Sequence, residues 1–144
     1  MKQPARILVA DDSRDDVFLL RQAFSEAGLA ASIDHMLDGE QAIQYLLKAD
    51  PAPDLILLDL KMPRMDGFGV LEWLRTQPRL GHLPAVVLSA SIIQEDKNKA
   101  KALGAHAFFT KPADFEDFIG LATNIYHQWL PPSQPERTIL QKQF

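Results

Sequence analysis

The stretch DLILLDLKMPRMDG, residues 54–67, places four consecutive aliphatic residues directly before an aspartate, Asp59. The unbroken run from Leu55 to Leu58 predicts a strand that is buried on both faces, because a half-exposed strand would alternate apolar and polar residues. A carboxylate at the end of such a strand loses its hydration, so it must find a partner, take up a proton or carry out chemistry. Asp59 is therefore the first candidate site residue.

Composition limits the classes of protein to consider. The 144 residues suit one domain, and the absence of cysteine excludes disulfides, thiolate metal sites and thiol catalysis. The net charge of −4 argues against a nucleic-acid partner. No segment approaches the roughly 20 apolar residues that span a bilayer, and the first residues lack the pattern of a signal peptide. We therefore expect a cytoplasmic protein that binds neither nucleic acid nor membrane.

Short apolar runs alternate with helical patterns along the chain. The predicted strands are Ala5–Ala10, 32–37, Leu55–Leu58, Ala85–Ser89 and 105–110. Predicted helices follow Asp12 or Ser13, follow the Asp38-Gly39 turn, and cover residues 68–76, 93–103 and 115–130. Five strands that alternate with five helices predict an α/β fold, a parallel sheet with helices on both faces. This domain covers residues 1–130, and the prolines that follow it begin a polar tail, residues 131–144.

Polar residues follow the predicted strands at one edge of the sheet. They are Asp11, Asp12, Asp59, Ser89, Lys111 and Pro112. Ligands of open α/β sheets bind beyond the carboxyl ends of the strands, where the strand order reverses. In the order 2-1-3-4-5 the first and third strands are neighbours, so the three aspartates would converge. Three carboxylates repel one another, and oxygen ligands without Cys or His favour Mg²⁺ or Mn²⁺.

Each of these residues also has an ordinary structural explanation. Residues 11–13 could only cap a helix, Asp59 could be a salt-bridge partner, Ser89 a strand-end hydroxyl and Lys111 a loop residue. Their joint placement at one sheet edge favours a site, because unrelated structural roles would scatter them over both edges. The histidines at positions 35, 82, 106 and 127 share no ligand spacing, so we predict no zinc site.

Residues 5–130 resemble the receiver domain of two-component response regulators. The matching motifs are LVADDS (8–13), LILLDLKMPRMDG (55–67), VVLSAS (86–91) and GAHAFFTKP (104–112). The resemblance implies a flavodoxin-like sheet with the order 2-1-3-4-5. It also implies a regulator that takes a phosphoryl group from a histidine kinase onto Asp59, and hydrolysis of the acyl phosphate then resets the signal.

Further roles are carried over from the same resemblance. Asp11 and Asp12, with Asp59 and the backbone carbonyl of Lys61, would hold Mg²⁺. Lys61 is a departure from an ordinary family member. Its side chain would lie near the phosphoryl group and the attacking water, where it would alter the rate of hydrolysis of the acyl phosphate.

The resemblance also assigns residues around the phosphoryl group. Ser89 and Lys111 would each bond a phosphoryl oxygen, and the Lys111–Pro112 peptide bond would be cis. Phe108 stands at the position of the switch aromatic. Because it lacks a hydroxyl to hold an outward state, we expect its ring partly inward before phosphorylation.

Two rival functions are weaker. A haloacid-dehalogenase phosphatase needs a second aspartate two residues after the nucleophile, where this chain has Lys61. A degenerate receiver that only binds partners usually lacks an acidic residue, the phosphoacceptor or the lysine, and this chain keeps all of them.

The output of the regulator is expected to be protein contact. The chain resembles regulators paired with bacterial phytochromes in DSRDDVFLLRQAF (12–24), in PRLGHLPAVVLSAS (78–91) and in a last helix that reaches Trp129. That helix carries one apolar stripe at spacings of three and four, composed of Phe115, Phe118, Ile119, Ala122, Ile125, Tyr126 and Trp129. We predict that most of the stripe is core and that its last two aromatics are partly exposed. With Ile92, Ile93, Phe108 and Phe109 they would form a homodimer interface through the fourth helix, fifth strand and fifth helix.

Overall fold

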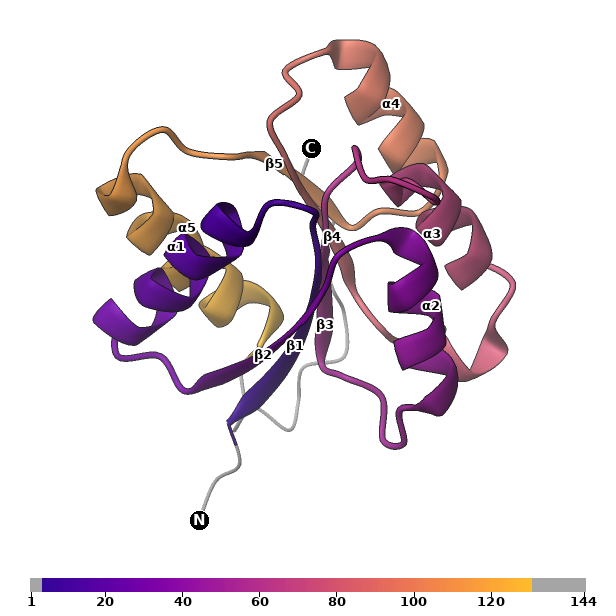
Figure 1. The fold of residues 1–144 in the computed structure, drawn as a ribbon, viewed down its shortest axis with the longest axis horizontal. Coiled ribbons are helices and arrows are strands. Elements are labelled where there is room, and N and C mark those ends of the chain that lie inside the picture. Colours follow the sequence, from indigo (N-terminus) through magenta and orange to yellow (C-terminus); the bar gives the residue numbers. More distant parts are fainter. Residues whose placement is uncertain (1–3, 131–144) are drawn as a thin grey trace.

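The computed structural model describes residues 4–130. Its five parallel strands form one sheet in the order β2-β1-β3-β4-β5 (Figure 1). The strands are β1 (Ala5–Ala10), β2 (Ala31–Met36), β3 (Leu55–Leu58), β4 (Ala85–Ser89) and β5 (Ala107–Thr110). The helices are α1 (Arg14–Glu26), α2 (Gly39–Lys48), α3 (Gly67–Leu74), α4 (Gln94–Ala102) and α5 (Phe115–Trp129), with a 3₁₀ turn at Pro78–Leu80. The predicted α/β class and strand order are confirmed.

The central strand β3 is buried on both faces, as its aliphatic run predicts. Leu55 and Leu57 pack into the core beneath α1 and α5, whereas Ile56 and Leu58 pack into the core beneath α2, α3 and α4. This division follows from the alternation of side chains along a strand. Figure 1 shows the two layers of helices on opposite faces of the sheet.

The helix and strand ends differ from the predicted ones by small amounts. The Ser13 side chain caps α1 by accepting a hydrogen bond from the Asp16 N–H at 3.2 Å. β5 begins at Ala107, two residues late, because the Ala105 N–H donates to the Ala100 carbonyl (3.0 Å) and so still belongs to the end of α4. Gly104 has a φ of 99° in that turn, where its lack of a side chain is needed.

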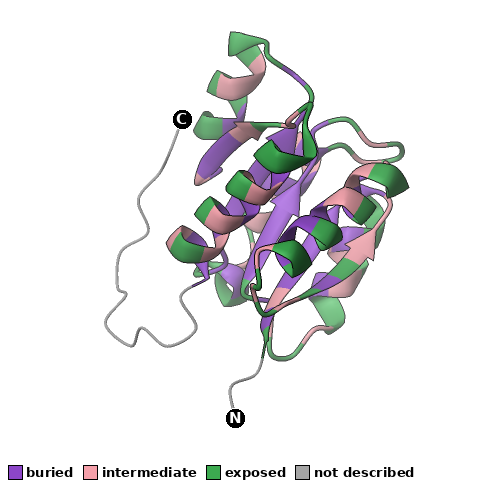
Figure 2. Cartoon of the chain, turned by 90° about the vertical axis from the view of Figure 1, so that its left-hand side faces the viewer, coloured by how far each residue is buried: buried purple, intermediate pink, exposed green. Residues whose placement is uncertain are grey.

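Two predictions about α5 are wrong. Trp129 is buried, with 3% of its surface exposed, because it belongs to the core beneath α1 and α5, where its indole also packs edge-on against the His106 ring at a centroid distance of 5.9 Å. Phe115, expected in the core, is 38% exposed because it lies in the first turn of α5. The buried residues lie in the strands of the sheet and on the helix faces that pack against it (Figure 2). The predicted tail, residues 131–144, lies outside the described residues.

None of the helices within residues 4–130 is long and apolar enough to cross a membrane.

Candidate functional site

The three predicted carboxylates meet at the carboxyl edge of the sheet. Ala10 of β1 pairs with Leu58 of β3, so Asp11 and Asp59 leave neighbouring strands at the same level. The Asp59 N–H donates to the Ala10 carbonyl at 2.9 Å and extends this pairing. One oxygen each of Asp11, Asp12 and Asp59 lies within 4.8 Å of the others. Asp11 and Asp59 are buried, and Asp12 is exposed.

Asp11 is held by contacts on both carboxylate oxygens. Its Oδ1 accepts a hydrogen bond from the Ser13 N–H at 2.9 Å, and its Oδ2 lies 2.9 Å from the Lys111 ammonium. Burial raises the pKa of Asp11, and the hydrogen bond from Lys111 offsets only part of that increase. The Asp11 carbonyl also lies 2.7 Å from Nε2 of His35 on β2, which places that nitrogen as the donor. The sequence analysis missed this contact of His35, which fixes the backbone of the site.

Lys111 extends from the end of β5 into the carboxylate cluster. Its Nζ lies 2.8 Å from Asp16, 2.9 Å from Asp11 and 3.4 Å from Asp59. Burial lowers the pKa of Lys111, but hydrogen bonds to Asp16 and Asp11 outweigh burial and raise it above its usual range. The ammonium is therefore charged at any physiological pH. Asp16 is a site residue that the sequence analysis missed, although it follows the acidic pair in the same segment.

The predicted cis bond between Lys111 and Pro112 is not found. Within residues 4–130 the cis peptide bond joins Asp50 and Pro51. The Lys111–Pro112 bond is trans. The Lys111 N–H donates to the Ser89 carbonyl at 2.8 Å, and the Lys111 side chain reaches the carboxylates.

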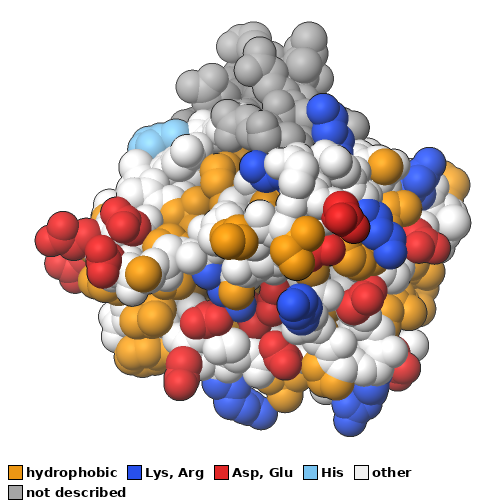
Figure 3. Space-filling view, turned by 90° about the horizontal axis from the view of Figure 1, so that it is seen from above, with side chains coloured by type: hydrophobic (Ala, Val, Ile, Leu, Met, Phe, Trp, Pro, Cys, Tyr) orange, Lys and Arg blue, Asp and Glu red, His pale blue; other side chains and the backbone are white. Residues whose placement is uncertain are grey.

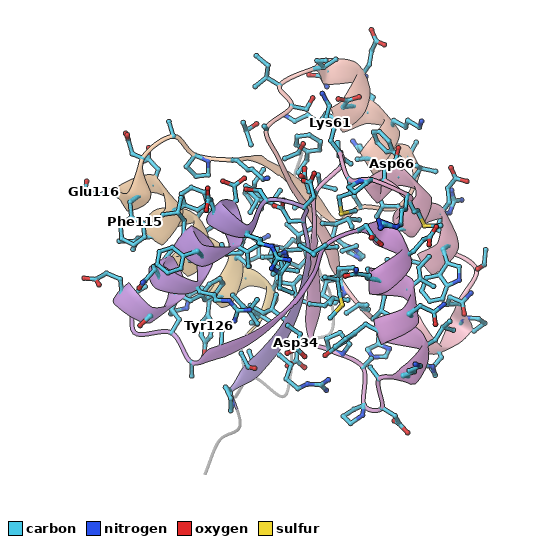
Figure 4. The ribbon with its side chains drawn as sticks, in the orientation of Figure 1. Asp34, Lys61, Asp66, Phe115, Glu116 and Tyr126 are labelled. Atoms are coloured by element: carbon cyan, nitrogen blue, oxygen red, sulfur yellow. The ribbon has the colours of Figure 1, made fainter. Side chains whose placement is uncertain are left out.

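The loop after β3 (residues 59–66) carries Lys61 and closes over the phosphoacceptor candidate. The Gly67 N–H donates to the Leu60 carbonyl at 3.0 Å, and the Leu60 N–H donates to Oδ1 of Asp59 at 2.8 Å. The exposed Lys61 lines a concavity of about 490 Å³ together with Asp12 and Asp66. Figure 4 labels Lys61 and Asp66 on this loop, and Figure 3 looks down on the edge, where acidic and basic side chains gather. Of the three clustered carboxylates, Asp12 is the one that lines this concavity.

The two predicted switch residues lie deeper. Ser89 ends β4 and is 1% exposed, and its Oγ accepts a hydrogen bond from the Ser91 N–H at 3.2 Å. Phe108 is 7% exposed and belongs to the core beneath α2, α3 and α4. Its ring therefore points inward in this structure.

A doubly wound sheet with three acidic residues and a lysine at its switch point defines a receiver-like phosphoacceptor site. Residues 7–123 match the response regulator receiver domain, and the chain belongs to this family. It is 32% identical over 136 residues to the response regulator Rcp1 of Synechocystis sp.. The alignment covers 88% of this chain and 90% of Rcp1.

Solved structures agree with the sequence match. The phosphorylated cyanobacterial phytochrome response regulator RcpA superposes with a TM-score of 0.82 at 29% identity, over 91% of this chain and 97% of RcpA. The Mn²⁺-bound form of Rcp1 superposes with a TM-score of 0.79 at 29% identity, over 95% of this chain and 99% of that one. The resemblance that the motifs predict is thereby confirmed.

Proposed function

We propose that this chain accepts a phosphoryl group from a histidine kinase onto Asp59 and passes the signal on by protein contact. The observation that carries the proposal is the convergence of Asp11, Asp12 and Asp59 around the Lys111 ammonium. An Asp59 oxygen forms a bond to phosphorus as the bond from phosphorus to the kinase histidine breaks, which produces an acyl phosphate. Attack of water on the phosphorus then breaks its bond to the Asp59 oxygen, which restores the carboxylate and releases inorganic phosphate. The chain is therefore a phosphoacceptor that assists its own phosphorylation and dephosphorylation rather than an enzyme that turns over a separate substrate.

The donor set suits a hard divalent cation, Mg²⁺ or Mn²⁺. Asp11, Asp12, Asp59 and the backbone carbonyl of Lys61 supply oxygen ligands, and the exposure of Asp12 leaves access for the waters that Mg²⁺ retains. The Mn²⁺-bound structure of the related Rcp1 supports this assignment. When bound, the cation neutralises charge on the phosphoryl oxygens.

Lys111 and Ser89 each donate a hydrogen bond to a phosphoryl oxygen in this proposal. Lys111 is already 3.4 Å from Asp59 and supplies positive charge where negative charge develops. Ser89 moves toward the phosphoryl group, and Phe108 fills the space that it leaves, because packed cores switch between discrete arrangements. Since Phe108 is buried in this structure, we place its resting state on the inward side.

The partners follow from the relatives and from the exposed surface. The phytochrome regulator RcpA among the similar structures supports a phytochrome-type kinase as the donor, and a cytoplasmic location accords with that donor. Ile92 and Ile93 are 85% and 53% exposed before α4, which supports a homodimer through α4, β5 and α5. Trp129 is removed from that interface because it is buried. The proposal includes no nucleic-acid or membrane partner.

Replacement of the phosphoacceptor tests the proposal. Asp59→Asn is expected to abolish incorporation of phosphate from a kinase or from acetyl phosphate. Asp54→Asn is the control, because Asp54 directly precedes β3, at the opposite end from Asp59. Its carboxylate accepts a hydrogen bond from the Arg6 N–H at 2.8 Å. Phosphate retained by Asp59→Asn at the wild-type level would contradict the assignment. Beryllofluoride with Mg²⁺ separates an active receiver, which binds it, from a degenerate receiver, which does not.

A further inference from the structure

The first turn of α1 supplies a carboxylate to the site in addition to the three at the strand ends. Oδ2 of Asp16 lies 2.8 Å from the Lys111 ammonium, compared with 2.9 Å for Asp11 and 3.4 Å for Asp59. The lysine is thus drawn toward α1 rather than toward the phosphoacceptor candidate. Its side chain is 11% exposed and that of Asp16 33%, so solvent screens this pair only in part.

Asp16 is positioned independently of the proposed metal ligands. The acidic cluster that could hold a cation consists of Asp11, Asp12 and Asp59. Asp16 is instead fixed by its helix, because its N–H donates to the Ser13 Oγ and the next residue, Val17, is buried in the core. A cation that occupies the cluster would engage Asp11 and Asp59 but would leave Asp16 facing Lys111.

The ammonium has a limited number of donors. It carries three N–H groups, and the structure surrounds them with three carboxylates. A phosphoryl group on Asp59 takes the place of the Asp59 carboxylate, so its oxygens must share the three N–H groups of Lys111 with Asp11 and Asp16, the two nearer carboxylates. We propose that Asp16 is a positioning residue that competes with the phosphoryl group for Lys111 and so weakens phosphoryl binding. This inference rests on the proposed phosphorylation of Asp59.

A neighbouring residue separates direct contact from the general effect of charge. Asp15 stands in the same first turn of α1 and is exposed, whereas the ion pairs of Lys111 within residues 4–130 are those with Asp11, Asp16 and Asp59. Asp15→Asn and Asp16→Asn remove the same charge from the same helix end. Only Asp16→Asn removes the carboxylate that contacts Lys111.

The test is calorimetric titration of beryllofluoride into each protein at saturating Mg²⁺. Asp16→Asn is expected to bind beryllofluoride about three- to fivefold more tightly than the wild type, as fits the loss of a competing, partly exposed ion pair. Asp15→Asn is expected to stay close to the wild type. Titration of Mg²⁺ alone should give similar affinities for all three proteins, because Asp16 lies outside the ligand set. Thermal unfolding of each variant verifies that the fold is intact.

Three results would overturn the inference. Unchanged or weaker beryllofluoride binding by Asp16→Asn, with normal binding by the wild type, overturns it alone. An equal gain in Asp15→Asn assigns the effect to charge rather than to contact with Lys111 and overturns it as well. A wild type that binds no beryllofluoride overturns both the inference and the proposed function.

Discussion

The loop after β3 and the loop after β4 leave the same edge of the sheet but differ in what holds them, a distant helix for the first and its own segment for the second. In the loop after β3, residues 59–66, the Met65 carbonyl accepts a hydrogen bond from the Gly39 N–H at 3.0 Å, and Arg64 contacts the buried Asp38 at 3.4 Å. The loop is thus fastened to the start of α2. In the loop after β4, residues 90–93, Ile92 and Ile93 are exposed, and the contacts are local ones: the Ser91 hydroxyl donates to Asp96 of α4 at 2.6 Å and accepts from the Ile93 N–H at 3.2 Å.

The helices that follow these loops differ in the same sense. α3 buries Gly67, Val70 and Leu71, whereas Ala100 alone is buried among the nine residues of α4, all of which the structure describes. Figure 1 shows α4 at the upper edge of its layer. Burial therefore anchors α3, which follows the Asp59 loop, more firmly than α4, which follows Ser89, although Ser89 itself is buried at the end of β4.

The largest expected effect comes from crowding the fixed loop at Gly67. A Cβ at this position would lie 2.3 Å from the Asp59 carbonyl oxygen, so the backbone beside Asp59 must shift. We expect Gly67→Ala to lower the free energy of unfolding by about 2–3 kcal/mol and to weaken Mg²⁺ binding. Urea denaturation and calorimetry measure the two effects.

Gly120→Ala is the matched control for this substitution. Nothing lies within 4 Å of a Cβ at Gly120, which is inside α5. Alanine there should raise the free energy of unfolding by up to about 1 kcal/mol, because glycine is a poor helix former. If the free energy of unfolding of Gly67→Ala equalled that of Gly120→Ala, the loop after β3 would accommodate a Cβ at Gly67 without loss of stability, and its contacts would not hold it in place.

The second effect comes from detaching the fixed loop from α2. Oδ1 of Asp38 accepts a hydrogen bond from the Gln41 N–H at 2.8 Å and caps α2, and its Oδ2 contacts Arg64. Asp38→Ala should lower the free energy of unfolding by about 1–2 kcal/mol. Asp114→Ala removes an aspartate that precedes α5 without making a capping hydrogen bond, so its effect should be much smaller. If chemical denaturation gave the same loss in the free energy of unfolding for Asp38→Ala and Asp114→Ala, Asp38 would not be the residue that holds the loop to α2.

Hydrogen exchange tests the contrast between α3 and α4 directly. Because α4 buries so little, its amides should open with a lower free energy than those of α3, on the order of 1 kcal/mol or more. Native-state exchange followed by mass spectrometry or NMR resolves the two helices. Protection in α4 equal to that in α3 would show that burial does not set the local stability at this edge.

The smallest effect on stability is expected in the loop after β4, at Ile92 and Ile93. Ile92→Ser with Ile93→Ser should change the free energy of unfolding by less than about 0.5 kcal/mol, because both side chains are exposed. The same double variant should shift the proposed homodimer toward monomer in light scattering. A monomeric wild type, with and without beryllofluoride, would exclude the homodimer and leave this surface for another partner.

Local sequence patterns predicted the parts of the fold that depend on burial along one segment. The run from Leu55 to Leu58 predicted a strand covered on both faces, and the carboxylates that follow β1 and β3 were predicted to converge. The end of α5 was less predictable. Its stripe indicated an apolar face, but whether Trp129 lay beyond the cover of the sheet depended on His106, which is distant in sequence.

By itself, the sequence determined the order of strands and helices, the family and the acidic edge, because each follows from hydrophobic periodicity, turn residues and short motifs. Only the tertiary structure decided how Lys111 divides its hydrogen bonds, since Asp16 is 95 positions away along the chain. It also decided that the peptide bond before Pro112 is trans. Such choices depend on distances between segments that packing alone brings together, to within a few tenths of an ångström, and no local pattern encodes them.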